Sequence, residues 1–210
     1  MKKFCFYCLI WIIAAGFHQV FGQERNHKPI FILDPGHGGI DSGAIGINGI
    51  KEKEVVLQIA KEVVRLNKLL FEDTLEIYLT RYSDTLISLG DRTKLANALK
   101  ADVFVSVHCN QALRKEAHGI EVYFDGTDRK SEELAMEFSH ELNDKLGFKT
   151  RGVKYANFQV LRETQNIPSV LLELGFISNW EEAEHNEKVS AISGYALLIL
   201  ETLSNFLYHD

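Results

Sequence analysis

Residues 30–53, IFILDPGHGGIDSGAIGINGIKEK, decide the fold and hold the first candidate functional group. The stretch begins with an apolar run, residues 30–33, that is typical of a buried strand. It then passes directly into residues 34–39, where glycines stand on both sides of His37. Because glycine lacks a Cβ atom, the backbone can turn sharply there. We therefore expect His37 to be presented to a ligand just beyond the end of a strand.

A predicted helix over residues 51–70 separates two nearby glutamates. At about 100° per residue, Glu52 falls on the apolar stripe with Val56 and Ile59, whereas Glu54 points the opposite way. A carboxylate on a buried stripe needs a cation or a proton. Glu52 is therefore a candidate metal ligand, although the helix dipole alone also favours a glutamate in a first turn. Glu54 is expected to be solvated.

The next elements alternate between strand and helix. Residues 75–79 and 102–107 are predicted strands, and a helix between them ends near Leu99. The second of these strands ends at His108. This order indicates an α/β sheet with helices on both faces, in which ligands gather where strands end. We therefore expect His37 and His108 to lie side by side.

The second half of the chain continues the pattern. We predict an edge or antiparallel strand over 119–124, a helix over 131–146, a weaker strand over 158–161, a short helix after Asn179, and a long amphipathic helix over 187–207. The apolar run 168–177 contains one acid, Glu173. An ionised carboxylate there is costly unless it is paired or exposed at a cleft, so Glu173 is a second candidate functional acid.

The amino terminus is typical of an exported protein. In residues 1–22, Lys2 and Lys3 precede an apolar stretch shorter than the roughly 20 residues that span a bilayer, so we predict a signal peptide. An uncleaved amphipathic anchor is the alternative. Residues 23–29 are then a short leader and residues 30–207 one domain.

The composition that remains after signal cleavage bears on disulfide content and on the class of partner. Only Cys109 remains, so no disulfide framework is expected. With 21 basic and 29 acidic residues, the formal charge is −8, and no basic tract is present. A nucleic-acid partner is therefore not expected.

His37, Glu52 and His108 form a three-ligand set that suits zinc. Catalytic zinc sites typically have three protein ligands and a water in the fourth position. The metal can lower the pKa of that water to about 7 and polarise a carbonyl. Glu173 is predicted to carry the proton from water to a leaving amine. The spacing is a moderate signal, because the ligands are scattered and no HExxH motif is present.

Three blocks of the chain resemble one family. They are DPGHGG with the following DSGA and GxxEK, SVHCN at 106–110, and VLLELGFISN at 170–179. They are similar to the zinc-dependent N-acetylmuramoyl-L-alanine amidases, the Amidase_3 class of bacterial cell-wall hydrolases, over nearly all of 30–207. The resemblance implies a phosphorylase/hydrolase-like α/β fold, Zn²⁺ on His37, Glu52 and His108, and Glu173 as the catalytic residue. It also implies hydrolysis of the amide between N-acetylmuramic acid and L-alanine in peptidoglycan, in the periplasm or outside the cell.

One departure from some relatives bears on regulation. Some periplasmic relatives carry a long helical insertion after the strand equivalent to 119–124, and this helix blocks the zinc until an activator removes it. Here residues 125–130 form the whole connection to the next helix. We therefore expect no autoinhibitory helix, no obligatory activator, and a monomer that acts on peptidoglycan.

Several alternatives remain open at this level. A zinc peptidase or deacetylase acting on another wall bond would use the same chemistry, and a non-catalytic wall-binding module could retain the fold. Among single residues, Asp34 is expected either to orient His37 or to cap the loop. Arg92 either binds a carboxylate or forms a structural salt bridge, and His118 either touches substrate or lies at the surface. The Cys109 side chain should point away from His108 as a small packed thiol.

Overall fold

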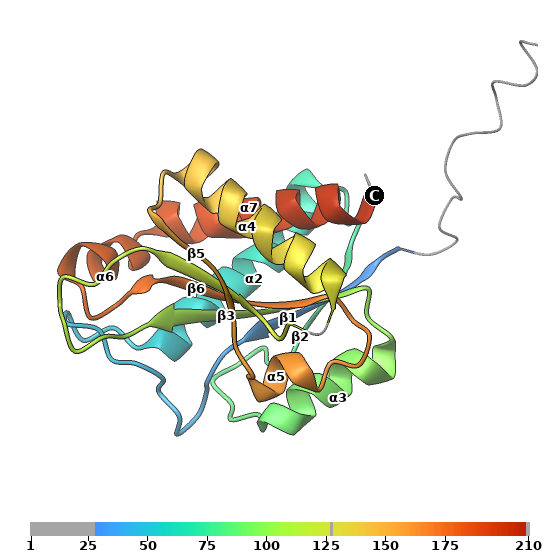
Figure 1. The fold of residues 1–210 in the computed structure, drawn as a ribbon, viewed down its shortest axis with the longest axis horizontal. Helices are drawn as coiled ribbons and strands as arrows, with labels where there is room; N and C mark the ends of the chain where they lie inside the picture. Colours follow the sequence, from blue (N-terminus) through green and yellow to red (C-terminus); the bar gives the residue numbers. More distant parts are fainter. Residues whose placement is uncertain (1–27, 127, 209–210) are drawn as a thin grey trace, which may run out of the picture.

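A six-stranded mixed sheet forms the centre of the computed structural model, which describes residues 28–126 and 128–208 (Figure 1). The strand order is β2-β1-β3-β6-β4-β5. The strands are β1 (Ile30–Pro35), β2 (Glu76–Leu79), β3 (Val103–Asn110), β4 (Ile120–Phe124), β5 (Thr150–Tyr155) and β6 (Ser169–Phe176). The predicted signal peptide lies outside the described residues.

Helices cover both faces of this sheet, as predicted (Figure 1). They are α2 (Glu52–Leu70), α3 (Leu89–Leu99), α4 (Arg129–Leu146), α5 (Gln159–Arg162), α6 (Trp180–Asn186) and α7 (Val189–Tyr208). The larger core lies between the sheet and α2, α4 and α7, and the smaller one lies under α3 and α5. Helix α7 is long and apolar enough to cross a membrane, but more than half of it is buried against its neighbours.

Four strands are parallel neighbours, and the other two run in the opposite direction. β2, β1, β3 and β6 run parallel, whereas β4 is antiparallel to β6 and parallel to β5. The antiparallel alternative for 119–124 is therefore confirmed, and the edge alternative is wrong, because β4 is paired on both sides. The carboxyl ends of β1, β3 and β6 meet at one edge of the sheet, where the candidate residues lie.

The predicted strand over 158–161 is wrong. This segment begins helix α5 after Phe158, and the strand of the region is β5, at residues 150–155. Val160 and Leu161 are buried in the smaller core. A four-residue apolar run does not distinguish strand from buried helix, and packing against this face of the sheet selects the helical form.

Candidate functional site

Three side chains that are far apart in sequence converge at the carboxyl edge of the sheet. One donor atom each from His37, Glu52 and His108 lies within 4.8 Å of the other two. Glu52 Oε1 is 3.0 Å from His37 Nε2 and 2.8 Å from His108 Nδ1. The two rings are 4.9 Å apart at their centroids. The predicted neighbourhood of the two histidines is therefore confirmed, and His108 lies near the carboxyl end of β3, which continues to Asn110.

His37 is held in place by a local contact with Asp41. Its backbone has a φ of 60°, in the left-handed region, and its Nδ1 is 2.8 Å from Asp41 Oδ2. Asp34 instead accepts hydrogen bonds from Thr80, Ser106 and Arg92, so of the two alternatives for Asp34 the one in which it orients His37 is wrong. In the sequence, the four-residue spacing between His37 and Asp41 could have indicated this contact.

Two glycines allow the close approach of these groups. A Cβ atom at Gly36 would lie 2.2 Å from Cε1 of His108, and one at Gly43 would lie 2.6 Å from Oε2 of Glu52. Gly43 also has a positive φ of 63°. Glycine is therefore required at both positions by space, and at Gly43 by backbone conformation as well.

Glu52 is 3% exposed at the first turn of α2, whereas Glu54 faces solvent, as the helical phase predicted. The Glu52 carboxylate accepts hydrogen bonds from the backbone N–H groups of Ala44 and Cys109. Burial opposes its ionisation, but the hydrogen bonds with His108 and His37 outweigh burial and hold the pKa of Glu52 well below its ordinary value. Burial acts to lower the pKa of His37, but the carboxylates of Glu52 and Asp41 together raise it to about 9.

Glu173 lies beside this group on β6, where it is paired in register with His108 on β3. Its Oε2 atom is buried and has no hydrogen-bond partner among the described residues. Burial raises the pKa of Glu173 to about 7, and the neighbouring charges of Glu52 and Glu121 act in the same direction. A buried, unpaired carboxyl oxygen at a cleft is free to exchange a proton with a bound molecule.

These residues line a cleft of about 930 Å³ that opens to solvent. Its lining includes the three converging residues and six others: His37, Glu52, His108, Glu173, Asn110, Leu86, Leu89, Phe158 and Leu171. One wall comes from the segment that enters α3, and another comes from α5. The cleft therefore presents polar groups at its base and apolar side chains along its sides, as small-molecule and peptide sites commonly do.

The remaining candidates have structural contacts. Arg92 forms a buried salt bridge with Asp34 at 2.6 Å. The buried Cys109 thiol is 3.8 Å from Asn186 Nδ2, and burial raises its pKa. His118 is exposed and contacts the carbonyl oxygen of Glu116. The structural alternative is therefore confirmed for Arg92, the packed thiol for Cys109, and the surface position for His118.

The carboxyl edge of the sheet thus holds two histidines and two glutamates, and three of these residues, His37, Glu52 and His108, could hold a metal ion. The chain belongs to the N-acetylmuramoyl-L-alanine amidase family Amidase_3, which matches residues 31–205. It is 44% identical over 170 residues to the N-acetylmuramoyl-L-alanine amidase LytC of Bacillus subtilis, covering 79% of this chain and 33% of that relative.

Other relatives agree in fold and sequence. The probable cell wall amidase LytH of Staphylococcus saprophyticus is 41% identical, over 80% of this chain and 57% of the relative. The chain thus spans between one third and three fifths of the length of these two curated relatives. Among solved structures, the catalytic domain of CwlV, an N-acetylmuramoyl-L-alanine amidase from Bacillus (Paenibacillus) polymyxa, matches with a TM-score of 0.79 and 35% identity. That match covers 85% of this chain and 98% of the other.

Proposed function

We propose that this protein hydrolyses the amide bond between N-acetylmuramic acid and L-alanine in peptidoglycan. The observation that carries the proposal is the convergence of His37, Glu52 and His108 beside the unpaired carboxyl of Glu173, at the base of one cleft. The names of its relatives describe amidases of this specificity and cell-wall amidases. The assignment of these four residues to the reaction is part of the proposal.

The donor set fits a zinc ion. Zinc ligands at about 2.0–2.2 Å in a tetrahedron are separated from each other by roughly 3.4 Å. The donor pairs measured here, at 2.8 Å and 3.0 Å, need to open by only about half an ångström to reach that separation. Asp41 faces Nδ1 of His37 and leaves Nε2 directed at Glu52, which is how a second carboxylate commonly orients a histidine ligand. His37, Glu52 and His108 would hold the ion.

The residues of the chain then carry the proton chemistry. When bound, zinc supplies Lewis-acid polarisation of the scissile carbonyl and lowers the pKa of a water molecule. Glu173 takes the proton from the attacking water as the new C–O bond forms. It returns this proton to the alanine nitrogen as the C–N bond breaks. The products are a lactyl carboxylic acid on the sugar and a peptide with a free L-alanine amino terminus.

The short connection between β4 and α4 supports the further proposal that the isolated monomer is active without an activator. Strand β4 ends at Phe124 and α4 begins at Arg129. Residues of the segments that enter α3 and α5 line the cleft. Because peptidoglycan lies outside the cytoplasm, the proposed activity also requires export, in line with the predicted signal peptide.

A digest of purified peptidoglycan tests the proposed function. The mature protein alone should release peptides that mass analysis identifies by an L-alanine amino terminus, and chelation should stop the release. Glu173→Ala should lower the rate at least about 100-fold, as loss of a general base does. Glu181→Ala, at an exposed glutamate on α6, serves as the matched control.

Other products would indicate another function. Cleavage within the peptide or loss of acetate would indicate the peptidase or deacetylase alternative. Binding without cleavage would indicate a wall-binding module. Release only after addition of a second protein would contradict the proposal of activity without an activator.

A further inference from the structure

A second charged cluster lies next to the proposed catalytic glutamate. Glu121 on β4 is buried, and its Oε1 atom accepts hydrogen bonds from Arg151 Nε and Lys154 Nζ, both at 2.6 Å. Its Oε2 atom accepts from Asn110 Nδ2 at 2.9 Å and from the Tyr123 hydroxyl at 2.6 Å. Four donors therefore saturate this carboxylate.

The cluster carries one more positive than negative charge. Two cations share a single carboxylate, and the side chains of Arg151 and Lys154 are 34% and 36% exposed. Among the described residues, the Lys154 ammonium donates one hydrogen bond, to Glu121, and so retains two of its three N–H donors. Within residues 28–126 and 128–208, no acceptor forms a hydrogen bond with the Nη2 group of Arg151. The exposed cations can therefore bind another anion.

Three contacts connect this cluster with the cleft. Glu121 and Glu173 are partners in the β4–β6 register, and directly opposed residues share one face of a sheet. Asn110, which donates to Glu121, lines the cleft. The Tyr123 ring packs edge-on against Phe158, another cleft residue, at 5.3 Å between centroids. The cluster therefore continues the cleft from β6 toward the edge strand.

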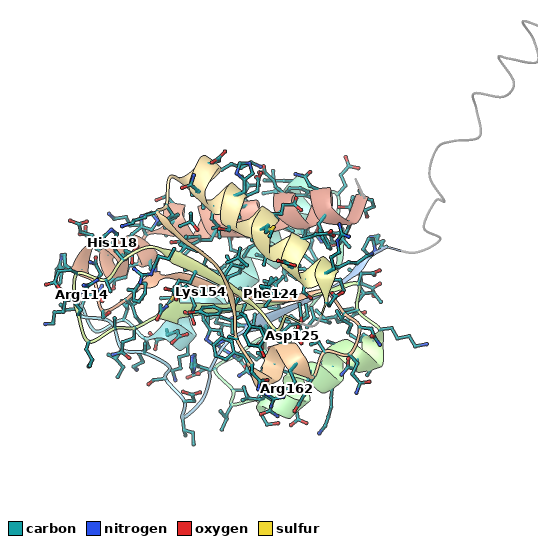
Figure 2. All side chains as sticks on the ribbon, viewed as in Figure 1. Arg114, His118, Phe124, Asp125, Lys154 and Arg162 are labelled. Carbon is teal, nitrogen blue, oxygen red and sulfur yellow. The ribbon has the colours of Figure 1, made fainter. Side chains whose placement is uncertain are left out.

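The distance to the reaction centre suits a peptide chain. Lys154 lies on β5, two strands away from β6, which corresponds to roughly 10 Å at the usual strand spacing. An extended peptide advances about 3.3 Å per residue, so roughly three residues cover this distance. In Figure 2, Lys154 lies between the loop that carries His118 and the helix that carries Arg162.

We propose that Lys154 and Arg151 form an anion subsite for a free carboxylate on the second or third residue of the stem peptide. The proposal rests on the proposed function, because it assumes that the peptide leaves the cleft across β4 and β5. It makes the charge state of the peptide a determinant of specificity. Stem peptides whose carboxylates are converted to carboxamides are then poorer substrates.

Two synthetic muramoyl tripeptides test the subsite. They differ only in whether the second and third peptide residues carry free carboxylates or carboxamides. We expect the wild-type protein to prefer the carboxylate form about tenfold in kcat/KM, mostly through KM, as one partly solvated charged hydrogen bond provides. Lys154→Met should abolish this preference, and Lys154→Arg should retain it. Lys145→Met is the matched control, because Lys145 on α4 also pairs with carboxylates at 2.6 Å and 2.8 Å, and its side chain is 43% exposed.

A binding measurement separates failure of the subsite from failure of the proposed function. Calorimetric titration of both tripeptides into Glu173→Gln reports the preference without hydrolysis. Equal affinity for the two forms, or an equal loss for both in the Lys154→Met background, would overturn the subsite. If the wild-type protein cleaves both forms equally, the proposed function stands and the subsite is wrong. If it cleaves neither form and Glu173→Gln still prefers the carboxylates, the subsite stands as a binding site and the amidase assignment is wrong.

Discussion

Replacing Glu52 by glutamine tests the central group of the site with a change of only a few atoms. The two carboxylate oxygens of Glu52 accept hydrogen bonds from backbone N–H groups, Oε1 from Cys109 and Oε2 from Ala44. In either orientation, the NH₂ group of glutamine would face one of these donors. A buried N–H group would then lose its acceptor, which costs about 1–3 kcal/mol. We expect the metal-free variant to lose this much free energy of unfolding.

The same variant should lose zinc. Changes to groups that only support a ligand already lower metal affinity about 10–100-fold, so loss of the anionic ligand itself should lower it more than about 100-fold. Competition with a chromogenic chelator measures this affinity, and urea unfolding in the presence of excess chelator measures the stability term. Glu54→Gln is the matched control, because Glu54 is 54% exposed and pairs only loosely with Lys51, at 3.6 Å. Its stability should stay within about 0.5 kcal/mol of wild type.

Wild-type zinc affinity in Glu52→Gln would refute the proposal that Glu52 is a zinc ligand. A loss of zinc by Glu54→Gln together with its retention by Glu52→Gln would overturn the helical-phase argument as well. An unchanged free energy of unfolding for metal-free Glu52→Gln would show that the two backbone donors find other acceptors.

Two further changes probe the surroundings of the site. Arg92→Met should lower the free energy of unfolding by about 3–5 kcal/mol, because it leaves the Asp34 carboxylate buried without its cation; urea unfolding measures this, and a loss below 1 kcal/mol would contradict it. Glu121 has a pKa of about 2 in the folded protein, since its hydrogen bonds outweigh the opposing effect of burial, against an ordinary value of 4.5. Its contribution is therefore complete above about pH 5 and is lost as the pH falls toward 2. After allowance for solvent screening, Glu121→Gln should lower the free energy of unfolding by about 1–2 kcal/mol at pH 5. This difference between variant and wild type should shrink as the pH falls from 5 to 2, which urea unfolding at each pH measures. A difference that stays constant over that range would contradict the linkage.

The helical phase of residues 51–70 was sufficient to place Glu52 inside and Glu54 outside, because the side chains of a helix follow a fixed local period. Packing on the smaller core overrode the pattern at 158–161, where four apolar residues suit a strand or a helix equally well. The sequence also left open whether Asp34 orients His37, and this alternative is wrong. Asp34 and Asp41 lie three and four residues from His37, and in the structure His37 has a left-handed backbone and its Nδ1 atom contacts Asp41.

By itself, the sequence determined the α/β class, the buried face of the first helix and the likeness to a family, since each of these depends on local periods and contiguous motifs. The tertiary structure alone decided which side chains meet. The strand order β3-β6-β4 places Glu173 between His108 and Glu121. Strand order depends on packing between segments that are far apart in the chain, and a period within one segment does not encode it. The position of Arg151 and Lys154 beside Glu121 and the cleft follows from that order, which pairs β4 with both β5 and β6.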